Sequence, residues 1–414
     1  MGSEMLLGEI AEIVMGQSPS GETCNNAGNG IPLLNGPTEF GPKHPVPVQY
    51  TTDAKRLGKE GDLLFCVRGS TTGKMNWANQ TYAIGRGLAA IRGKNNYPNS
   101  YIRAAIELEL NSLLNQATGS TFPNVSKDQL NAISLTKTSP EAATDIALII
   151  EPIDDRITLL RETNATLEAI AQALFKSWFV DFDPVRAKAE GREPEGMPAE
   201  VADLFPSEFE ETELGEIPKG WKVCSLDQIA KFLNGLAMQK FPVEAGVETL
   251  PVIKIAQLRK GDTIGADKAS SNIKPEYVVY DGDVLFSWSG SLEVEIWCGG
   301  KGALNQHLFK VSSDEYPKWF YYLWTKHHLA NFREIAAGKA TTMGHIQRHH
   351  LVEAKVITPS PKLLAEMSAV ILPVMDRAIE CMLQIKTLTE LRDTLLPRLM
   401  SGKLRIPDLE EQAA

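Results

Sequence analysis

The pentapeptide Gly61-Asp62-Leu63-Leu64-Phe65 recurs 221 residues later as Gly282-Asp283-Val284-Leu285-Phe286. Other pairs keep this spacing: Thr138-Ser139-Pro140 with Pro359-Ser360-Pro361, Pro152 with Pro373, Asp155-Arg156 with Asp376-Arg377, Leu167 with Leu388, and Leu174 with Leu395. Near the start, Ile10-Ala11 and Gly16 match Ile229-Ala230 and Gly235 at a spacing of 219. Such a series indicates an internal duplication. The sequence therefore predicts a globular half, a helix and a linker, followed by a second globular half and helix.

Each repeated pentapeptide opens a short apolar run, 61–67 and 282–288, which predicts a buried strand. Gly, Pro and Asn residues separate further runs that predict strands, at Ile31–Leu34, Val46–Tyr50, Ala83–Ile91, Leu250–Ile255, Tyr277–Tyr280 and Ala303–Val311. Tyr101–Leu114 and Lys318–Ile335 are predicted helices. The fold class is therefore α+β, with two mixed α/β domains in tandem.

The segments after Pro140 and Pro361 predict two long helices with heptad seams. The first seam consists of Ile146, Ile150, Ile153, Ile157, Leu160, Asn164, Leu167, Ala171, Leu174 and Trp178. Shifting these positions by 221 gives Met367, Ile371, Val374, Ala378, Cys381, Ile385, Leu388, Arg392, Leu395 and Leu399. The matched seams favour an antiparallel coiled coil, with two separate core helices as the alternative. Pro152 and Pro373 predict a kink or a fresh helix start, and Asn164 predicts a register-fixing position.

A chain of 414 residues predicts two or three domains. We expect globular domains at 1–136 and 215–358, helical segments at 137–180 and 359–414, and a linker at 181–214. The linker has three basic and eleven acidic residues and no hydrophobic period, so it accounts for most of the net charge of −10. The globular domains carry net charges of 0 and +2. Overall charge therefore does not decide the partner.

The composition excludes several classes of protein. No apolar run reaches the roughly 18 residues of a membrane span, and Met1–Ile13 has three glutamates and no basic residue, unlike a signal peptide. Five scattered cysteines without a C-x-x-C pair argue against a disulfide framework and a structural zinc site. They fit a reducing cytoplasm.

Catalytic motifs are also missing from the sequence. The segment Gly69–Met75 is one residue too short for a phosphate-binding loop, and no Pro-Pro pair completes a methyltransferase motif. Trp288-Ser289-Gly290-Ser291 is not a nucleophile elbow. His345, His349 and His350 cluster without the partners of a known metal motif. We therefore expect no catalytic residue, no metal and no cofactor bound by this chain.

Four stretches resemble the specificity (S) subunit of type I restriction-modification systems. They are Ala173–Val185, Leu214-Gly-Glu-Ile-Pro-Lys-Gly-Trp221, Gly119-Ser-Thr-Phe-Pro-Asn-Val125 and Leu399-Met-Ser-Gly-Lys-Leu404. The resemblance covers the whole chain. Two departures are mild: the first domain lacks a Pro-x-Gly-Trp entry, and Ala340–Met343 is a looser copy of Gly119–Pro123.

The resemblance implies a non-catalytic subunit that binds double-stranded DNA in prokaryotic defence. Each globular half would be a target recognition domain for one half of a split, asymmetric sequence. The paired helices would act as a spacer and as the docking surface for two methyltransferase (M) subunits. The M subunits would carry S-adenosylmethionine and DNA methylation, and through them the complex would hold restriction (R) motor-nuclease subunits that use ATP and Mg.

Candidate DNA contacts follow from residue type and loop position. Arg and Asn read guanine and adenine, Glu accepts from cytosine, Lys neutralises phosphate, and hydroxyls bind phosphate. After the two predicted strands the candidates are Arg68, Ser70, Thr71, Thr72, Lys74, Asn76 and Trp77, and Ser287, Ser289, Ser291 and Glu293. Further loop candidates are Ser120, Thr121, Asn305, Gln306, His307, Thr341 and Thr342. The basic candidates elsewhere are Lys43, Arg86, Lys240, Lys254, Arg259 and Arg348.

Apolar residues off the two seams predict partner docking. A pair of helices buries one stripe on each, so a second stripe needs a further partner, as in a four-helix bundle. The candidates are Leu159, Ile170, Phe175 and Phe179, with Leu391, Leu396 and Met400 on the second helix. Two other classes of function stay open: a duplicated scaffold or adaptor without nucleic acid, and a duplicated enzyme with an unfamiliar site.

Overall fold

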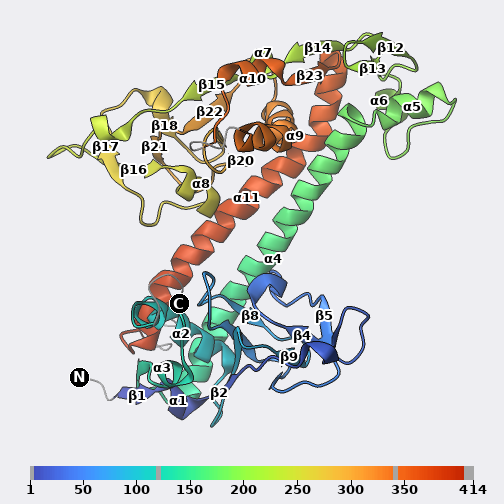
Figure 1. The fold of residues 1–414 in the computed structure, drawn as a ribbon. Helices are drawn as coiled ribbons and strands as arrows, with labels where there is room; N and C mark the ends of the chain where they lie inside the picture. Colours follow the sequence, from blue (N-terminus) through green and yellow to red (C-terminus); the bar gives the residue numbers. More distant parts are fainter. Residues whose placement is uncertain (1–3, 118–122, 339–343, 405–414) are drawn as a thin grey trace, which may run out of the picture. The chain divides into compact units, whose positions relative to one another are not determined.

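The computed structural model describes residues 4–117, 123–338 and 344–404, and the chain forms two compact units. The first unit consists of Met1–Glu162 and Thr387–Ala414, and the second of Thr163–Lys386. Each unit contains one globular domain and a part of two long helices, α4 (Pro140–Phe179) and α11 (Pro361–Met400) (Figure 1). The prediction of two mixed α/β domains in tandem, with long helices, is confirmed.

The first domain contains a four-stranded sheet of order β2-β10-β7-β8, a five-stranded sheet of order β3-β5-β4-β9-β6, and the pair β1-β11. The strands are β1 (Glu4–Leu6), β2 (Ala11–Met15), β3 (Cys24–Asn25), β4 (Ile31–Leu34), β5 (Gln49–Thr51), β6 (Leu57–Gly58), β7 (Leu63–Cys66), β8 (Met75–Trp77), β9 (Tyr82–Ile84), β10 (Leu88–Gly93) and β11 (Ser134–Thr136). The helices are α1 (Leu7–Ile10), α2 (Asn99–Asn115) and α3 (Lys127–Asn131).

The second domain repeats this order except for the edge strand β3, which has no counterpart among its described strands. Its sheets are β15-β22-β19-β20 and β17-β16-β21-β18, and β14 pairs with β23. The strands are β14 (Lys222–Ser225), β15 (Lys231–Asn234), β16 (Thr249–Ile253), β17 (Lys268–Ser270), β18 (Val278–Val279), β19 (Val284–Ser287), β20 (Val294–Ile296), β21 (Gly302–Leu304), β22 (Leu308–Ser312) and β23 (Lys355–Thr358). The helices are α7 (Leu226–Ile229), α8 (Ile255–Lys260), α9 (Lys318–Ala337) and α10 (Arg348–Glu353).

The repeated pentapeptides form the central strands β7 and β19. In β7, Leu63 and Phe65 pack into the core that contains α2, while Leu64 and Cys66 pack on the opposite face. Val284 and Phe286 of β19 face the core that contains α9, and Leu285 faces the other side. Successive side chains of a strand point to opposite faces, so a strand buried on both faces has a continuous apolar run. The predicted strands 61–67 and 282–288 are confirmed by this arrangement.

Helices α4 and α11 pack in opposite directions within each unit. In the first unit, Ile146 lies beside Leu399, and Asp154 accepts a hydrogen bond from Arg392 at 3.0 Å. In the second unit, Ala171 belongs to the same core as Met367 and Ile371. None of the twenty predicted seam positions is exposed. The antiparallel packing of the two seams is therefore present in both units.

Neither seam proline starts a new helix, which corrects that part of the prediction. Pro152 and Pro373 lie inside the continuous helices α4 and α11. Both prolines are exposed, and so are Leu148 and Ala369, the residues four positions earlier. The carbonyl that loses its helical partner at each proline is therefore on a solvated face, where water satisfies it at low cost.

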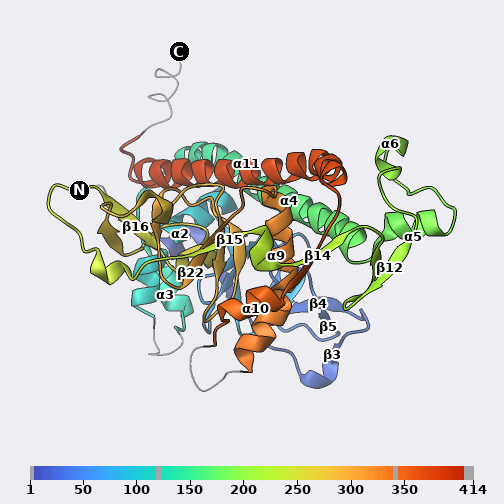
Figure 2. The same cartoon turned by 90° about the horizontal axis from the view of Figure 1, so that it is seen from above.

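The acidic segment 181–214 is folded, so its prediction as a compliant linker is wrong. It contains α5 (Asp183–Ala189), α6 (Ala199–Ala202) and β12 (Phe209–Thr212), which pairs with β13 (Gly215–Pro218). Figure 2 shows α5, α6 and β12 grouped beyond the end of α4. Phe182 and Phe205 are buried and contact Trp221, with ring centroids 6.1 and 6.4 Å apart. A few isolated aromatic residues thus order a segment that lacks a hydrophobic period.

Within the residues that the structure describes, no helix combines the length and the apolar character that a bilayer crossing requires. All five cysteines are free: Cys24 and Cys224 are half-buried, and Cys66, Cys298 and Cys381 are buried.

Candidate nucleic-acid interface

Four loops meet at one end of the first domain, which we call the first loop end. They are the exit of β2 (Gly16–Ser18), the β7–β8 loop (Val67–Lys74), the β9–β10 turn (Gly85–Gly87) and the segment 123–125. The Val67 amide donates to the carbonyl of Gly87, and the Val125 amide to the carbonyl of Val67, both at 2.9 Å. Thr72 Oγ1 donates to the Pro123 carbonyl at 2.8 Å.

The second domain has an equivalent second loop end, made of 235–237, the β19–β20 loop (288–293), the β21–β22 turn (Asn305–His307) and 344–346. Its bonds repeat those of the first. The Trp288 amide donates to the His307 carbonyl at 3.3 Å, and the Ile346 amide to the Trp288 carbonyl at 3.0 Å. The isolated bridges Arg68–Asn124 and Ser289–His345 are also 221 residues apart. The two loop ends therefore share one backbone framework.

Glycine explains one of the repeated pairs. A Cβ on Gly16 would lie 2.1 Å from the carbonyl oxygen of Gly85, and a Cβ on Gly235 would lie 2.2 Å from that of Asn305. No larger residue fits at either position without moving the backbone. The exit of the first strand and the central turn are thus held in direct contact in both domains.

The first loop end is basic. Arg68, Lys74 and Arg86 are exposed on the β7–β8 loop and the β9–β10 turn, next to the exposed Ser70. Thr71 and Thr72 are half-buried in the same loop, where Thr72 is used to bind backbone. Five predicted contacts therefore lie together on the first loop end, namely Arg68, Ser70, Thr71, Lys74 and Arg86. Thr72 lies there too, but its hydroxyl is bonded to backbone.

The second loop end is polar and has no arginine or lysine in its turn. The Trp288 indole Nε1 donates to Asn234 Oδ1 at 2.9 Å and to the Gln306 carbonyl at 3.2 Å. Ser289 Oγ lies 2.9 Å from His307 Nδ1, and Gln306 Nε2 lies 3.3 Å from His307 Nε2. The two loop ends therefore offer different hydrogen-bonding groups on the same framework.

Three predicted contacts of the first domain lie away from the loop end. Asn76 is buried, and its Nδ2 donates to the Gly41 carbonyl at 2.7 Å, so it is not available to a base. Lys43 Nζ pairs with Asp155 of α4 at 2.7 Å. Trp77 packs under Arg103, whose guanidinium is 5.8 Å from the ring centroid. Lys43 and Trp77 line a cleft of about 660 Å³ between the first domain and α4.

Several predicted contacts of the second domain support the fold instead. Ser287 is fully buried, and its Oγ donates to the Ser291 carbonyl at 2.6 Å. Glu293 pairs with Arg333 at 2.8 Å, so this carboxylate is already engaged. Asn305 is buried and accepts from the His307 amide at 3.2 Å. Ser289 is also buried, whereas Ser291 is exposed on the β19–β20 loop.

The remaining basic candidates fall into two groups. Lys254 pairs with Asp267, and Arg348 donates to the Phe232 carbonyl at 3.2 Å while it lies over the Phe309 ring. Lys240 and Arg259 are exposed. The loop candidates Ser120, Thr121, Thr341 and Thr342 lie outside the described residues.

The docking candidates divide by burial. Leu159, Ile170 and Leu391 are exposed, at 52%, 43% and 45%. The prediction is wrong for Phe175, Phe179, Leu396 and Met400, which are buried in the cores of their own units. Sequence reasoning missed Leu148, which is 65% exposed. Leu148, Leu159 and Ile170 are 11 residues apart, and because 11 residues make about three turns, they share one face of α4.

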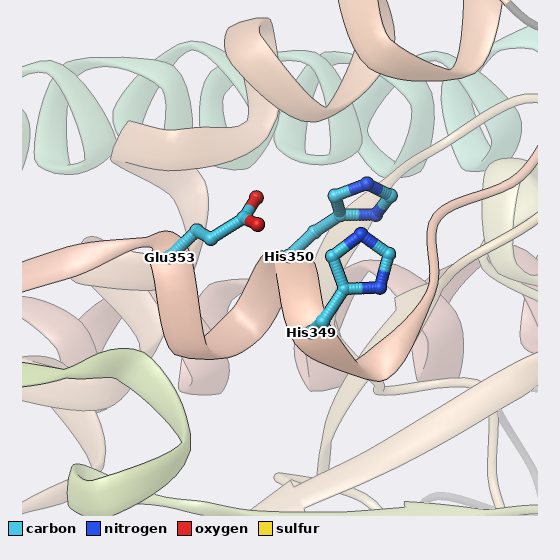
Figure 3. Close-up of side chains that lie close together, drawn as sticks. All are labelled: His349, His350 and Glu353. Carbon is cyan, nitrogen blue, oxygen red and sulfur yellow. The ribbon is translucent and has the colours of Figure 1, made fainter.

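The histidine cluster on α10 has the residue types of a metal site, but the lone pair of His350 is already used in a hydrogen bond. His349, His350 and Glu353 point to the same side of the helix (Figure 3), and a donor atom of each lies within 4.8 Å of the others. However, His350 Nδ1 accepts the Gln347 amide hydrogen at 2.9 Å. Neutral His350 therefore carries its proton on Nε2 and has no free lone pair for a metal. Binding would require this helix cap to break.

Two domains with one framework and two different sets of loop side chains define a protein with two similar but unequal recognition modules. The chain belongs to the family described as the type I restriction modification DNA specificity domain, whose model matches residues 3–169 and 218–390. Subunits of this family are non-catalytic, and methylation and cleavage reside in the M and R subunits. The chain thus has a role in DNA sequence specificity.

Relatives of similar length support this membership. The chain is 26% identical over 410 residues to the type I restriction enzyme HindI specificity subunit of Haemophilus influenzae, covering 85% of this chain and 88% of the relative. It is 24% identical over 426 residues to the MjaIX specificity subunit of Methanocaldococcus jannaschii, covering 97% and 93%. The S subunit from M. genitalium has the same fold, with a TM-score of 0.57, 13% identity and 96% coverage of both chains.

Proposed function

We propose that this chain is the sequence-specific double-stranded DNA-binding subunit of a type I restriction-modification complex, and that it reads a bipartite, asymmetric target. Each loop end reads one half-site. The observation that carries the proposal is that the two loop ends share their backbone hydrogen bonds but differ in their side chains. A shared framework approaches DNA in the same way twice, and different side chains read different bases.

The charge distribution supports DNA as the partner despite the net charge of −10. The acidic residues concentrate in 181–214, which packs within the second unit, while Arg68, Lys74 and Arg86 are exposed on the first loop end. Basic side chains on loops neutralise phosphates and give binding that weakens with salt. The turn of the second loop end has no arginine or lysine, and Glu293 of its β19–β20 loop is paired with Arg333, which suits reading of base edges more than attraction to the phosphate backbone.

We also propose that two M subunits dock on the exposed faces of α4 and α11. Leu148, Leu159 and Ile170 form an apolar stripe on α4, and Leu391 is exposed on α11. Such a stripe is explained by partner helices that complete a bundle. The R subunits join through the M subunits. S-adenosylmethionine belongs to the M subunits, and ATP and Mg to the restriction reaction. Free cysteines fit assembly in the cytoplasm.

Selection from random duplex DNA tests the proposal. The chain is combined with the M subunits of its own complex, and bound duplexes are sequenced after several rounds of enrichment. The expected product is two short, different sequences separated by an unspecified spacer of constant length. Enrichment of one continuous sequence, or of two identical half-sites, would refute the proposal that two modules read two different half-sites. Failure to retain any duplex at low salt would favour a scaffold without nucleic acid.

A further inference from the structure

The turn at the centre of each loop end is the same structural element in both domains. In the first domain, the Gly85 amide donates to the Leu34 carbonyl at 2.8 Å, and in the second the Asn305 amide donates to the Ile253 carbonyl at 3.2 Å. Each turn then closes with a bond of 3.0 Å, from Leu88 to Gly85 and from Leu308 to Asn305. Arg86 and Gln306 are therefore equivalent residues, each at the middle of its turn.

Both turns are rigid platforms. Each is bonded to the strand beside it and to the β7–β8 or β19–β20 loop, and the glycine at the exit of β2 or β15 packs directly against it. A side chain that discriminates between bases must be held within about half an ångström of its productive position. The hydrogen bonds around each turn restrain the backbone that carries its middle residue.

The side chains at this position differ in a way that matters for base reading. Arg86 is exposed, and its guanidinium makes no bond within the described part of the chain. The amide of Gln306 is fixed by His307. Because an amide nitrogen has no lone pair, Gln306 Nε2 is the donor to His307 Nε2 at 3.3 Å. The other hydrogen of Nε2 and the oxygen Oε1 make no bond among the described residues.

A relay of hydrogen bonds sets this orientation. His307 Nε2 accepts from Gln306, so its proton is on Nδ1, which donates to Ser289 Oγ at 2.9 Å. Ser289 is buried and lies in the β19–β20 loop. Ser289 and His307 are thus positioning residues, and the half-buried Gln306 keeps one donor and one acceptor without a bond among the described residues.

We infer that Arg86 and Gln306 are the specificity-determining residues of the two half-sites, and that Arg86 reads a guanine and Gln306 an adenine. Arginine forms two parallel bonds to O6 and N7 of guanine, and glutamine pairs its amide with N6 and N7 of adenine. This inference rests on the proposed function and deepens it. It assigns one base in each half-site to one equivalent position of the repeat.

Exchange of the two side chains tests the inference. The variants Arg86→Gln and Gln306→Arg are each combined with the M subunits, and bound duplexes are selected from a random library. Arg86→Gln is expected to change one base of its half-site from guanine to adenine, and Gln306→Arg one base of the other from adenine to guanine. Each change should amount to about ten-fold or more in preference at that position. The other half-site should stay as in the wild type.

A control variant separates base recognition from the general attraction of an added positive charge to DNA. Asn272→Arg adds the same charge as Gln306→Arg at an exposed residue of the second domain outside its loop end. It should leave every base preference unchanged. An unaltered preference in both exchange variants, while the wild type still selects two half-sites, would overturn the inference and leave the proposed function standing. A wild type that selects no duplex would instead overturn the proposed function.

The relay has its own test. His307→Ala frees the Gln306 amide to rotate, so the preference for adenine at that position should fall several-fold while affinity for random duplex stays the same. A merely structural role of His307 would lower affinity for all sequences together. Equal losses for selected and random DNA would therefore contradict the positioning role, and loss confined to one base would support it.

Discussion

Phe179 shows why the aromatic motif at the end of α4 is needed. Its ring is 1% exposed and lies 5.3–6.0 Å from the rings of Phe175, Trp221, Trp319, Phe320 and Trp324. Aromatic pairs at these distances contribute more than their buried area alone. Phe179 therefore anchors the end of α4 in the second domain, and the motif Ala173–Val185 is a packing motif at this residue.

Removing this ring should destabilise the protein strongly. Phe179→Ala is expected to lower the free energy of unfolding by roughly 3–5 kcal/mol, because it leaves a cavity among five aromatic rings. Ile170→Ala, on the same helix but 43% exposed, should change it by about 0.5 kcal/mol or less. Denaturant unfolding of the full chain measures both values. Similar effects of the two substitutions would contradict the burial of Phe179.

Lys74 is exposed on the first loop end, where the proposed function assigns it a contact with a DNA phosphate. Lys74→Ala should weaken binding to selected and random duplexes by the same factor, and should lower the slope of log affinity against log salt by about 0.9, the value for one phosphate contact. Lys137→Ala is a matched control, because Lys137 is an exposed lysine of the first unit beyond β11. Fluorescence anisotropy over a salt series gives both slopes. An unchanged slope for Lys74→Ala would remove Lys74 from the interface.

His328 makes the second unit sensitive to acid. The pKa of His328 is lowered to about 4, mainly by burial and also by His327, although the hydrogen bond from Nε2 to the Lys355 carbonyl at 2.8 Å acts to raise it. The unfolded pKa is about 6.5, so the unfolded state binds the proton first as the pH falls. Stability is therefore complete above pH 6.5 and decreases down to about pH 4, by roughly 3 kcal/mol at most.

Chemical unfolding at pH 4.5 and 7 checks this expectation. In His328→Gln, the difference between the two unfolding free energies should be smaller than in the wild type, because glutamine does not titrate. An equal difference in both proteins would show that other groups carry the acid sensitivity.

Elements with a regular spacing of apolar residues could be predicted from the sequence. Elements that are ordered by packing against residues far away in the chain could not. The seams of α4 and α11 and the strands β7 and β19 follow from a repeated spacing of apolar residues. The segment 181–214 has no period, yet Phe182 and Phe205 order it against Trp221, which no local pattern reveals. For the same reason, the sequence predicts Phe175 and Phe179 as surface residues of a helix pair, whereas the second domain buries them.

The turn at the centre of each loop end could not be predicted from the sequence for a similar reason. The runs 83–91 and 303–311 read as single strands, but each consists of two strands separated by a turn, Gly85–Gly87 or Asn305–His307. The sequence does place Arg86, Asn305, Gln306 and His307 among the candidates. It does not show that Arg86 and Gln306 are equivalent, because this follows only from hydrogen bonds to strands far away in the chain.

The exposed stripe of α4 provides a prediction for the helices. Leu159→Glu together with Ile170→Glu should prevent assembly with one M subunit, because a charge in an apolar helix interface costs several kcal/mol. The fold should survive, since both residues are exposed. Mass photometry of the reconstituted complex would then show the loss of one copy. A complex that still contains two M subunits would mean that docking uses another surface.

The whole molecule is a duplication whose two copies have diverged at their loop ends. Strand order, turn geometry and the glycines at the strand exits agree between the copies. The two copies differ in the side chain at the middle of the turn, which is Arg86 in the first and Gln306 in the second. Under the proposed function, this arrangement permits a change of target without a change of fold, because the residues proposed to read bases are separate from the backbone that holds the turn.

Replacement of one domain tests the central claim most directly. Residues 1–136 are exchanged for the first domain of another specificity subunit, and the selected DNA of the chimera is sequenced beside that of the parent with the same M subunits. The account predicts that one half-site takes the new sequence while the other keeps every base of the parent target. A chimera that assembles normally and changes both half-sites, or neither, would contradict independent reading by two modules.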